Sequence, residues 1–308
     1  MTNSPSSVDP DGLLEYSVVY TDRALNHMSV SFREVMRDLS STLKDVYSAE
    51  AVAIIPGSGT FAMEAVARQL ATGQKCLVVR NGWFSYRWTQ IFAAGNLPAS
   101  ETVCKAHPTS DEPNPHYAPV NLDTLVQTIR TERPAVVFVA HVETSAGMIL
   151  PEDYVRQVGE ATRAVGGLLV VDCIASGAMW LDMKDCKVDV LITAPQKGWT
   201  GTPCAGVVLL NDRALERVAQ TESNSFACDL KKWLQIMNRY EEGGHAYHAT
   251  MPTDGLRVFR DVMLEARAYG FELLKTKQQE LGDRIRALCA TRWKSLAAPA
   301  FAAPSVVV

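Results

Sequence analysis

The stretch 194–203, Ala-Pro-Gln-Lys-Gly-Trp-Thr-Gly-Thr-Pro, joins two apolar runs at residues 188–192 and 205–210. Both runs have the length and composition of buried β-strands. The lysine between them, Lys197, is unusual because a buried ammonium group loses most of its solvation. Lys197 is therefore either an ordinary exposed lysine of a loop or a buried amine that is bound covalently as an imine.

Apolar runs that predict strands alternate with helical patterns along most of the chain. The predicted strands cover residues 51–55, 75–79, 135–140, 167–172, 188–192 and 205–210, and the predicted helices cover 29–47, 61–70, 121–130, 151–165, 226–240 and 254–291. This alternation indicates an α/β fold with a mainly parallel sheet. Open sheets of this kind bind ligands at the carboxyl ends of their strands, so polar groups at these ends are the candidates for function.

A glycine-rich turn follows the first predicted strand. Ser58, Gly59 and Thr60 come directly before a predicted helix, where backbone N–H groups and the helix dipole favour an anion such as phosphate. An ordinary N-cap turn is the alternative. The turn also fits the dinucleotide motif G-x-G-x-x-A, but the next strand ends in Arg80 and not in an acid, so NAD binding is disfavoured.

Three further strand ends carry candidate groups. An aromatic cluster occupies residues 83–88, a polar loop occupies 141–147, and Asp172 closes the strand at 167–172. If Lys197 forms an imine, the partner is the aldehyde of pyridoxal 5'-phosphate (PLP). Asp172 would then face the pyridinium nitrogen and keep it protonated, although it could equally cap a turn.

The composition excludes several other classes of protein. The chain has 308 residues, 30 Lys and Arg against 34 Asp and Glu, and seven cysteines without a CxxC pair. We therefore expect no nucleic-acid partner, no disulfide framework and no metal site. The beginning of the chain lacks the features of a signal peptide, and no apolar run is long enough for a membrane span, so the expected location is cytoplasmic.

Five short motifs follow one another in a fixed order: Gly57-Ser58-Gly59-Thr60, Asn81-Gly82-x-Phe84-x-x-Arg87, His141-x-Glu143-Thr144-x-x-Gly147, Asp172-x-x-Ala175-Ser176 and Gln196-Lys197. Jointly they resemble the class V aminotransferases of fold type I, particularly the alanine/serine–glyoxylate (or pyruvate) group. The resemblance implies a mainly parallel seven-stranded sheet sandwiched by helices. It also implies an N-terminal arm (1–20), a large PLP-binding domain (21–255) and the start of a small, incomplete C-terminal domain (256–308).

The resemblance also implies roles for individual residues. Lys197 would hold PLP as a Schiff base and shuttle a proton, and Asp172 would pair with the ring nitrogen. The remaining cofactor-binding residues would be Ser58, Gly59, Thr60 and Gln196 at the phosphate, Phe84 and Ile174 on the two faces of the ring, and Thr144 near its phenolic oxygen. Tyr247 and Thr250 would reach the phosphate of a neighbouring subunit, which implies a homodimer with shared active sites.

The implied reaction moves an amino group from a small amino acid, of the alanine or serine type, to a 2-oxo acid, glyoxylate or pyruvate. Two alternatives remain: another fold type I PLP enzyme, such as a lyase or cysteine desulfurase, or a PLP-binding remnant without turnover. Relatives continue beyond the position of Val308 and supply there an arginine for the substrate carboxylate, for which the sequence shows no counterpart. The sequence leaves the exact donor and acceptor open.

Overall fold

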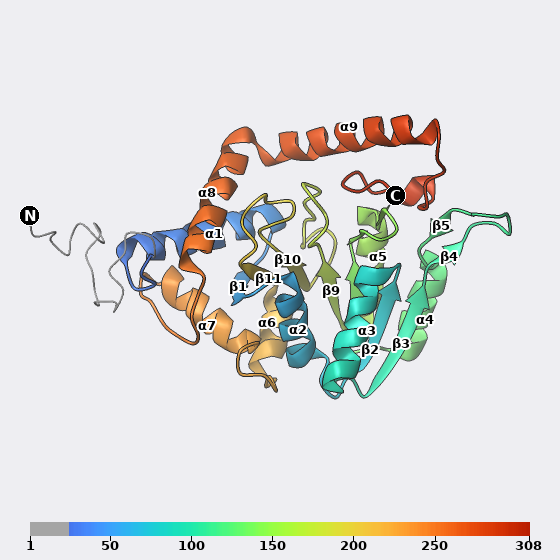
Figure 1. The fold of residues 1–308 in the computed structure, drawn as a ribbon. Helices are drawn as coiled ribbons and strands as arrows, with labels where there is room; N and C mark the ends of the chain where they lie inside the picture. The colour runs from blue at the N-terminus through green and yellow to red at the C-terminus, as the bar shows by residue number, and fades with distance from the viewer. Residues whose placement is uncertain (1–24) are drawn as a thin grey trace, which may run out of the picture.

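The computed structural model describes residues 25–308, and a seven-stranded sheet lies at the centre of the fold (Figure 1). The predicted arm at residues 1–20 lies outside the described residues. In spatial order the strands are β1 (Ala51–Pro56), β11 (Ala205–Leu210), β10 (Val190–Thr193), β9 (Leu168–Asp172), β6 (Val136–Ala140), β2 (Lys75–Arg80) and β3 (Ser100–Lys105). β11 runs opposite to the other six strands of this sheet, which share one direction, so the predicted mainly parallel seven-stranded sheet is confirmed.

Helices cover both faces of the sheet. Figure 1 shows α2 (Gly59–Leu70) and α3 (Trp83–Gly95) on one face and α4 (Leu122–Glu132) and α5 (Glu152–Ala164) on the other. Right-handed crossovers explain this division, because the chain moves across the sheet in one direction through α2 and α3 and in the opposite direction through α4 and α5. All strand carboxyl ends except that of β11 consequently meet at one edge.

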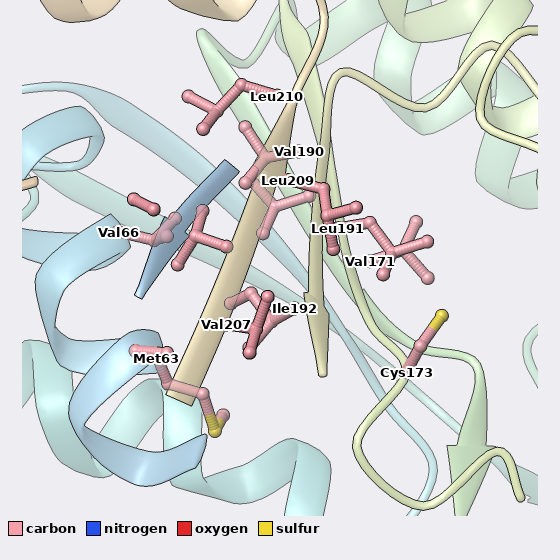
Figure 2. Packing of buried hydrophobic residues seen from close by; sticks show 14 of the residues in the cluster. Met63, Val66, Val171, Cys173, Val190, Leu191, Ile192, Val207, Leu209 and Leu210 are labelled. Atoms are coloured by element: carbon pink, nitrogen blue, oxygen red, sulfur yellow. The ribbon is translucent and has the colours of Figure 1, made fainter. Parts of the chain in front are cut away.

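The middle strands are buried on both faces, which is why their sequences are apolar without alternation. Figure 2 shows the packing of Val190, Leu191 and Ile192 of β10 and Val207, Leu209 and Leu210 of β11 with Met63 and Val66 of α2. Each fully buried side chain of this size stabilises the fold by roughly 1.5–3 kcal/mol. The result is a rigid platform beneath the carboxyl edge.

Three capped helices close the β1 end of the molecule. They are α1 (Val30–Tyr47), α6 (Asp212–Ala219) and α7 (Leu230–Glu241), and a side chain at the N-cap of each accepts a backbone hydrogen bond: Ser29, Asn211 and Asp229, respectively. Such caps typically contribute about 1 kcal/mol each. The apolar faces of α1 and α7 cover β1, which would otherwise be an exposed edge strand.

The single helix predicted at 254–291 is wrong. Two helices, α8 (Thr253–Tyr269) and α9 (Phe271–Ala290), are separated by Gly270, whose φ of 100° is open to glycine but costly for other residues. The break lets α9 turn across the carboxyl edge of the sheet (Figure 1). The predicted boundary between residues 255 and 256 falls inside α8, so the domain division stays a prediction.

Short elements complete the carboxyl edge. β4 (His107–Pro108) pairs with β5 (Tyr117–Ala118), and β7 (Val142–Glu143) pairs with β8 (Met148–Ile149). The last residues contain a 3₁₀ turn, η2 (Pro299–Phe301). Val308 is held by Leu296, whose N–H donates to the Val308 oxygen at 3.0 Å.

Within residues 25–308, no helix is long and apolar enough to cross a membrane. The same part of the chain contains no group of three or more His, Cys, Asp or Glu side chains that could hold a metal ion.

Candidate active site

Asp172 lies at the carboxyl end of β9 and is only 7% exposed. Its Oδ1 accepts a hydrogen bond from the Ile174 N–H at 2.9 Å. Burial raises the pKa of Asp172 to about 6, and nearby Glu143 acts in the same direction, while the Ile174 N–H and Arg87 oppose the shift. A carboxylate in this setting gains stability from a cationic partner that is buried with it.

The glycine turn and the Asp172 loop touch each other. Gly59 begins α2, and a Cβ added to it would lie 2.4 Å from Cδ1 of Ile174. Thr60, the next residue, accepts a hydrogen bond through Oγ1 from Nη1 of Arg87 at 3.2 Å. The N-terminus of α2 therefore contacts both the loop after Asp172, through Ile174, and α3, through Arg87.

A buried carboxylate fixes the start of α3. Glu143 has no exposed surface and accepts from the N–H groups of Phe84 (3.1 Å) and Ser85 (2.8 Å). It also accepts from the hydroxyls of Ser85 (2.7 Å) and Ser145 (2.6 Å). Phe84 is thereby held half-buried, with the Arg87 guanidinium 5.2 Å from the centre of its ring.

Lys197 lies in the loop between β10 and β11, and its side chain is exposed. The expectation of an amine buried between two strands is therefore wrong. The loop closes on itself through a hydrogen bond from the Gly201 N–H to the Pro195 oxygen (2.8 Å), and Lys197 lies between these two residues. It lines a cavity of about 470 Å³ together with Thr144, Ala175, Gly177, Gln278 and Ser305.

Two close contacts fix the loop of Lys197. A Cβ on Gly198 would lie 2.1 Å from the Gly177 oxygen, so the Lys197 loop rests directly on the turn that follows Asp172. Trp199 is buried and its ring centre lies 4.5 Å from that of Trp180. Gln196 lies between β10 and Lys197 in the chain. Its side-chain oxygen is buried and has no hydrogen-bond partner among the described residues.

Residues 5–292 match the aminotransferase class-V family. The chain belongs to this family. It is 28% identical over 241 residues to a 2-aminoethylphosphonate–pyruvate transaminase of Vibrio vulnificus, which covers 77% of this chain and 61% of the relative. It is 26% identical over 274 residues to an alanine–glyoxylate aminotransferase of Rattus norvegicus, which covers 87% and 62%. The chain thus spans less than two thirds of these relatives.

The fold of this class-V chain is also that of solved aminotransferases. An alanine–glyoxylate aminotransferase from Nostoc sp. superimposes with a TM-score of 0.79, covering 91% of this chain and 72% of the other, at 23% identity. At this level of identity the likeness concerns the fold. The fold type I architecture that the motifs implied is therefore confirmed.

Some of the predicted site residues of this class-V chain lie together. Thr144 and Lys197 line one cavity, and Gly59 contacts Ile174 next to Asp172. Tyr247 and Thr250 are exposed, lie 3.4 Å apart through their hydroxyls and do not line this cavity. Their predicted role toward a neighbouring subunit stays a prediction.

Several residues of the site were not singled out from the sequence. Glu143 was visible only as part of a motif, although a lone acid after a doubly apolar strand is a recognisable feature. Gln278 and Ser305 reach the cavity from distant parts of the chain, and no local pattern marks them. His141 is buried with Nδ1 2.8 Å from the Ser176 hydroxyl, and burial lowers its pKa to about 4, so it is neutral at pH 7.

Proposed function

We propose that this chain is a PLP-dependent aminotransferase that moves an amino group from a small amino acid, of the alanine or serine type, to glyoxylate or pyruvate. The observation that carries the proposal is the meeting of Asp172, the Gly59 turn and the Lys197 loop at one edge of the sheet. The names of the relatives, which specify pyruvate or glyoxylate, support the choice of amino acceptor.

The residues present fit PLP. A buried carboxylate with a raised pKa suits a pyridinium nitrogen, because the cation would lower the cost of ionising Asp172. Ser58 and Thr60 at the N-terminus of α2 suit a phosphate. Gln196, whose side chain is partly buried and whose side-chain oxygen has no partner among residues 25–308, would donate to the phosphate through its NH2 group, which carries two donors.

Each residue then has a distinct task. Lys197 would anchor the cofactor through Nζ and, once released, carry the proton that leaves the substrate Cα. Phe84 would cover one face of the ring and Ile174 the other, which keeps water from the reacting carbon. When bound, PLP supplies a ring that withdraws electrons from the substrate. Thr144 would donate to the ring's phenolic oxygen.

The wider assignments belong to the same proposal. We propose a cytoplasmic homodimer in which Tyr247 and Thr250 of each subunit complete the phosphate site of the other. Their exposed hydroxyls are compatible with an interface. We also propose that residues 256–308 begin a small C-terminal domain after a PLP-binding domain at 21–255.

The desulfurase alternative is disfavoured by the thiols. Such chemistry needs an accessible thiolate. Cys204 is 9% exposed, and burial raises its pKa to about 11. Cys228 is 6% exposed, and burial raises its pKa as well. Neither thiol is therefore suited to accept sulfur from a substrate.

Substitution of Lys197 tests the proposal. We expect Lys197→Ala to lower the rate with alanine and glyoxylate by at least about 10³-fold, because the proton carrier and the anchor are both lost. Lys184→Ala is the control, since Lys184 is exposed and forms an ion pair with Glu50 at 3.0 Å. Undiminished turnover of the Lys197 variant would rule the mechanism out. Binding of PLP to the unaltered chain, followed by no spectral change with any amino donor, would favour the remnant.

A further inference from the structure

A second hollow, of about 430 Å³, lies at the carboxyl ends of β2 and β3. It shares no residue with the cavity of Lys197. Its walls combine positive charge with aromatic rings and are formed by Arg80, Asn81, Gly82, Trp83, Tyr86, Lys105, Ala106 and Tyr117. The proposed aminotransferase reaction assigns no role to this charge or to these rings.

Two cations that line this hollow lie side by side on neighbouring strands. Arg80 ends β2 and Lys105 ends β3, and the two are directly opposite in the parallel register. Residues paired in this way point to the same face of a sheet, and like charges in such pairs destabilise it. Among residues 25–308, neither Arg80 nor Lys105 forms an ion pair with an acidic side chain.

At the opposite end of β2, an acidic side chain neutralises the cation. Lys75 begins the strand, lies opposite the uncharged Ser100 and forms an ion pair with Glu132 at 2.7 Å. β2 thus begins with a cation that an acid neutralises, whereas the cation at its end lies beside a second one on β3 and neither is paired with an acid among residues 25–308. Only the second end borders a hollow.

The aromatic wall adds a flat apolar surface. The Arg80 guanidinium lies 4.9 Å from the ring centre of Tyr86, and the ring of Trp83 is 5.9 Å from that of Tyr86. Trp83 is 59% exposed despite its size. Asn81, which also lines the hollow, is 6% exposed, and its Oδ1 has no hydrogen-bond partner among the described residues.

We propose that this hollow binds small molecules that join an aromatic ring to a dianionic phosphoryl group, that is, aryl phosphate monoesters. The two cations would take the dianion through charge-assisted hydrogen bonds, with the guanidinium offering two parallel donors. Trp83 and Tyr117 would contact the ring of the ligand. A water held between the ligand and Asn81 could donate to the unpartnered Oδ1.

Phenyl phosphate is the probe. It is titrated into protein that has been loaded with PLP and then freed of excess PLP, so that the Lys197 cavity does not compete and no free PLP competes for the hollow. Binding is followed by calorimetry and by tryptophan fluorescence, with Trp83→Phe identifying the part that comes from Trp83. We expect Arg80→Gln and Lys105→Gln each to weaken binding about tenfold or more, as expected for the loss of a charge-assisted contact. Lys75→Gln is the matched control on the same strand and is expected to leave the affinity unchanged.

Two comparisons make the outcome decisive. Inorganic phosphate should bind at least about tenfold more weakly than phenyl phosphate, because it lacks the ring. Equal affinity for the two ligands, or equal weakening by all three variants, would overturn the proposal. Loss of fluorescence quenching in Trp83→Phe, with the heat of binding retained, would support it. Because binding is measured without turnover, the result is independent of whether the chain is an aminotransferase.

Discussion

Asp172 is a buried carboxyl group, and its ionisation lowers the folding stability of the cofactor-free protein. Its pKa is about 6 in the folded chain against 3.8 in an unfolded one. Between these values the folded state binds the proton more tightly, so the stabilising contribution is complete below about pH 4 and is lost as the pH rises through 6. Ionised Asp172 therefore makes the cofactor-free protein less stable at neutral pH than at acid pH.

The first prediction concerns Asp172→Asn, which keeps an oxygen for the Ile174 N–H but cannot ionise. Relative to the unaltered protein, the cofactor-free variant should gain up to roughly 3 kcal/mol of unfolding free energy between about pH 4 and pH 8, since one pKa unit corresponds to about 1.4 kcal/mol. Urea unfolding at the two pH values measures the gain. A difference that is the same at both would contradict the pKa of Asp172.

The second prediction concerns Glu143, the carboxylate at the start of α3. Glu143→Ala leaves the N–H groups of Phe84 and Ser85 buried without acceptors, so it should destabilise the protein by roughly 3–5 kcal/mol. Glu143→Gln should cost less, because one oxygen remains. Urea unfolding compares the two variants. Similar stability of Glu143→Ala and the unaltered chain would exclude the anchoring role.

At the scale of single residues, the sequence predicted the acid, the glycine turn and the lysine but not their surroundings. The apolar strands that flank Lys197 left a buried and an exposed side chain as alternatives, and the side chain is exposed in a loop that packs on a distant turn through Gly198 and Gly177. Gln278 and Ser305 are 81 and 108 residues from Lys197 in the chain (278 − 197 and 305 − 197). Their approach is set by how α9 crosses the sheet, which no local pattern encodes.

At the scale of elements, the contact between the Lys197 loop and the turn after Asp172 is the closest approach at the site. Both sides are backbone, Gly198 against the Gly177 oxygen, so neither can yield as a side chain would. The relative position of the two catalytic candidates therefore depends on one glycine.

The third prediction follows from this contact. Gly198→Ala should displace the Lys197 loop, raise the apparent Kd for PLP about tenfold or more and lower the unfolding free energy by roughly 1–3 kcal/mol. Gly201→Ala is the control in the same loop, because its added Cβ would lie 3.3 Å from the nearest atom, the Pro195 oxygen. Absorbance titration with PLP gives the Kd. Equal effects of both substitutions would show that the close approach is unimportant.

Elements with strong periodicity were predicted from the sequence, and elements that depend on a turn were not. The helix at 30–47 and the strand at 205–210 appear where expected. The break at Gly270 was missed because a single glycine is tolerated within many helices. α3 was missed because its aromatic residues obscure the helical pattern, and β3 because it is only half-buried.

At the scale of the whole molecule, the last residues return to the carboxyl edge and are held there by α9. Arg286 donates through Nη2 to the oxygens of Ala303 (2.6 Å) and Val306 (3.3 Å). Ser305 donates to the Ala175 oxygen at 3.2 Å, next to the Lys197 cavity. The wall of the cavity thus depends on a guanidinium that does not line it.

The fourth prediction tests this dependence. Arg286→Ala should speed amide hydrogen exchange at 303–308 by about 10- to 100-fold, as expected when hydrogen bonds to a charged group are lost, and should leave the sheet strands unchanged. Arg284→Ala, on the same helix and exposed, is the control. Exchange resolved by mass spectrometry measures both. Faster exchange throughout the sheet would mean that Arg286 supports the whole fold.

The position of β1 has a consequence for synthesis. Its sheet neighbour is β11, which begins 149 residues after β1 ends (205 − 56). A ribosome that adds about 5–20 residues per second needs on the order of 10 s to supply that partner. During this interval the backbone N–H and C=O groups of the apolar strand β1 have no partner strand. We therefore expect the nascent chain to bind chaperones that shield unpaired strands.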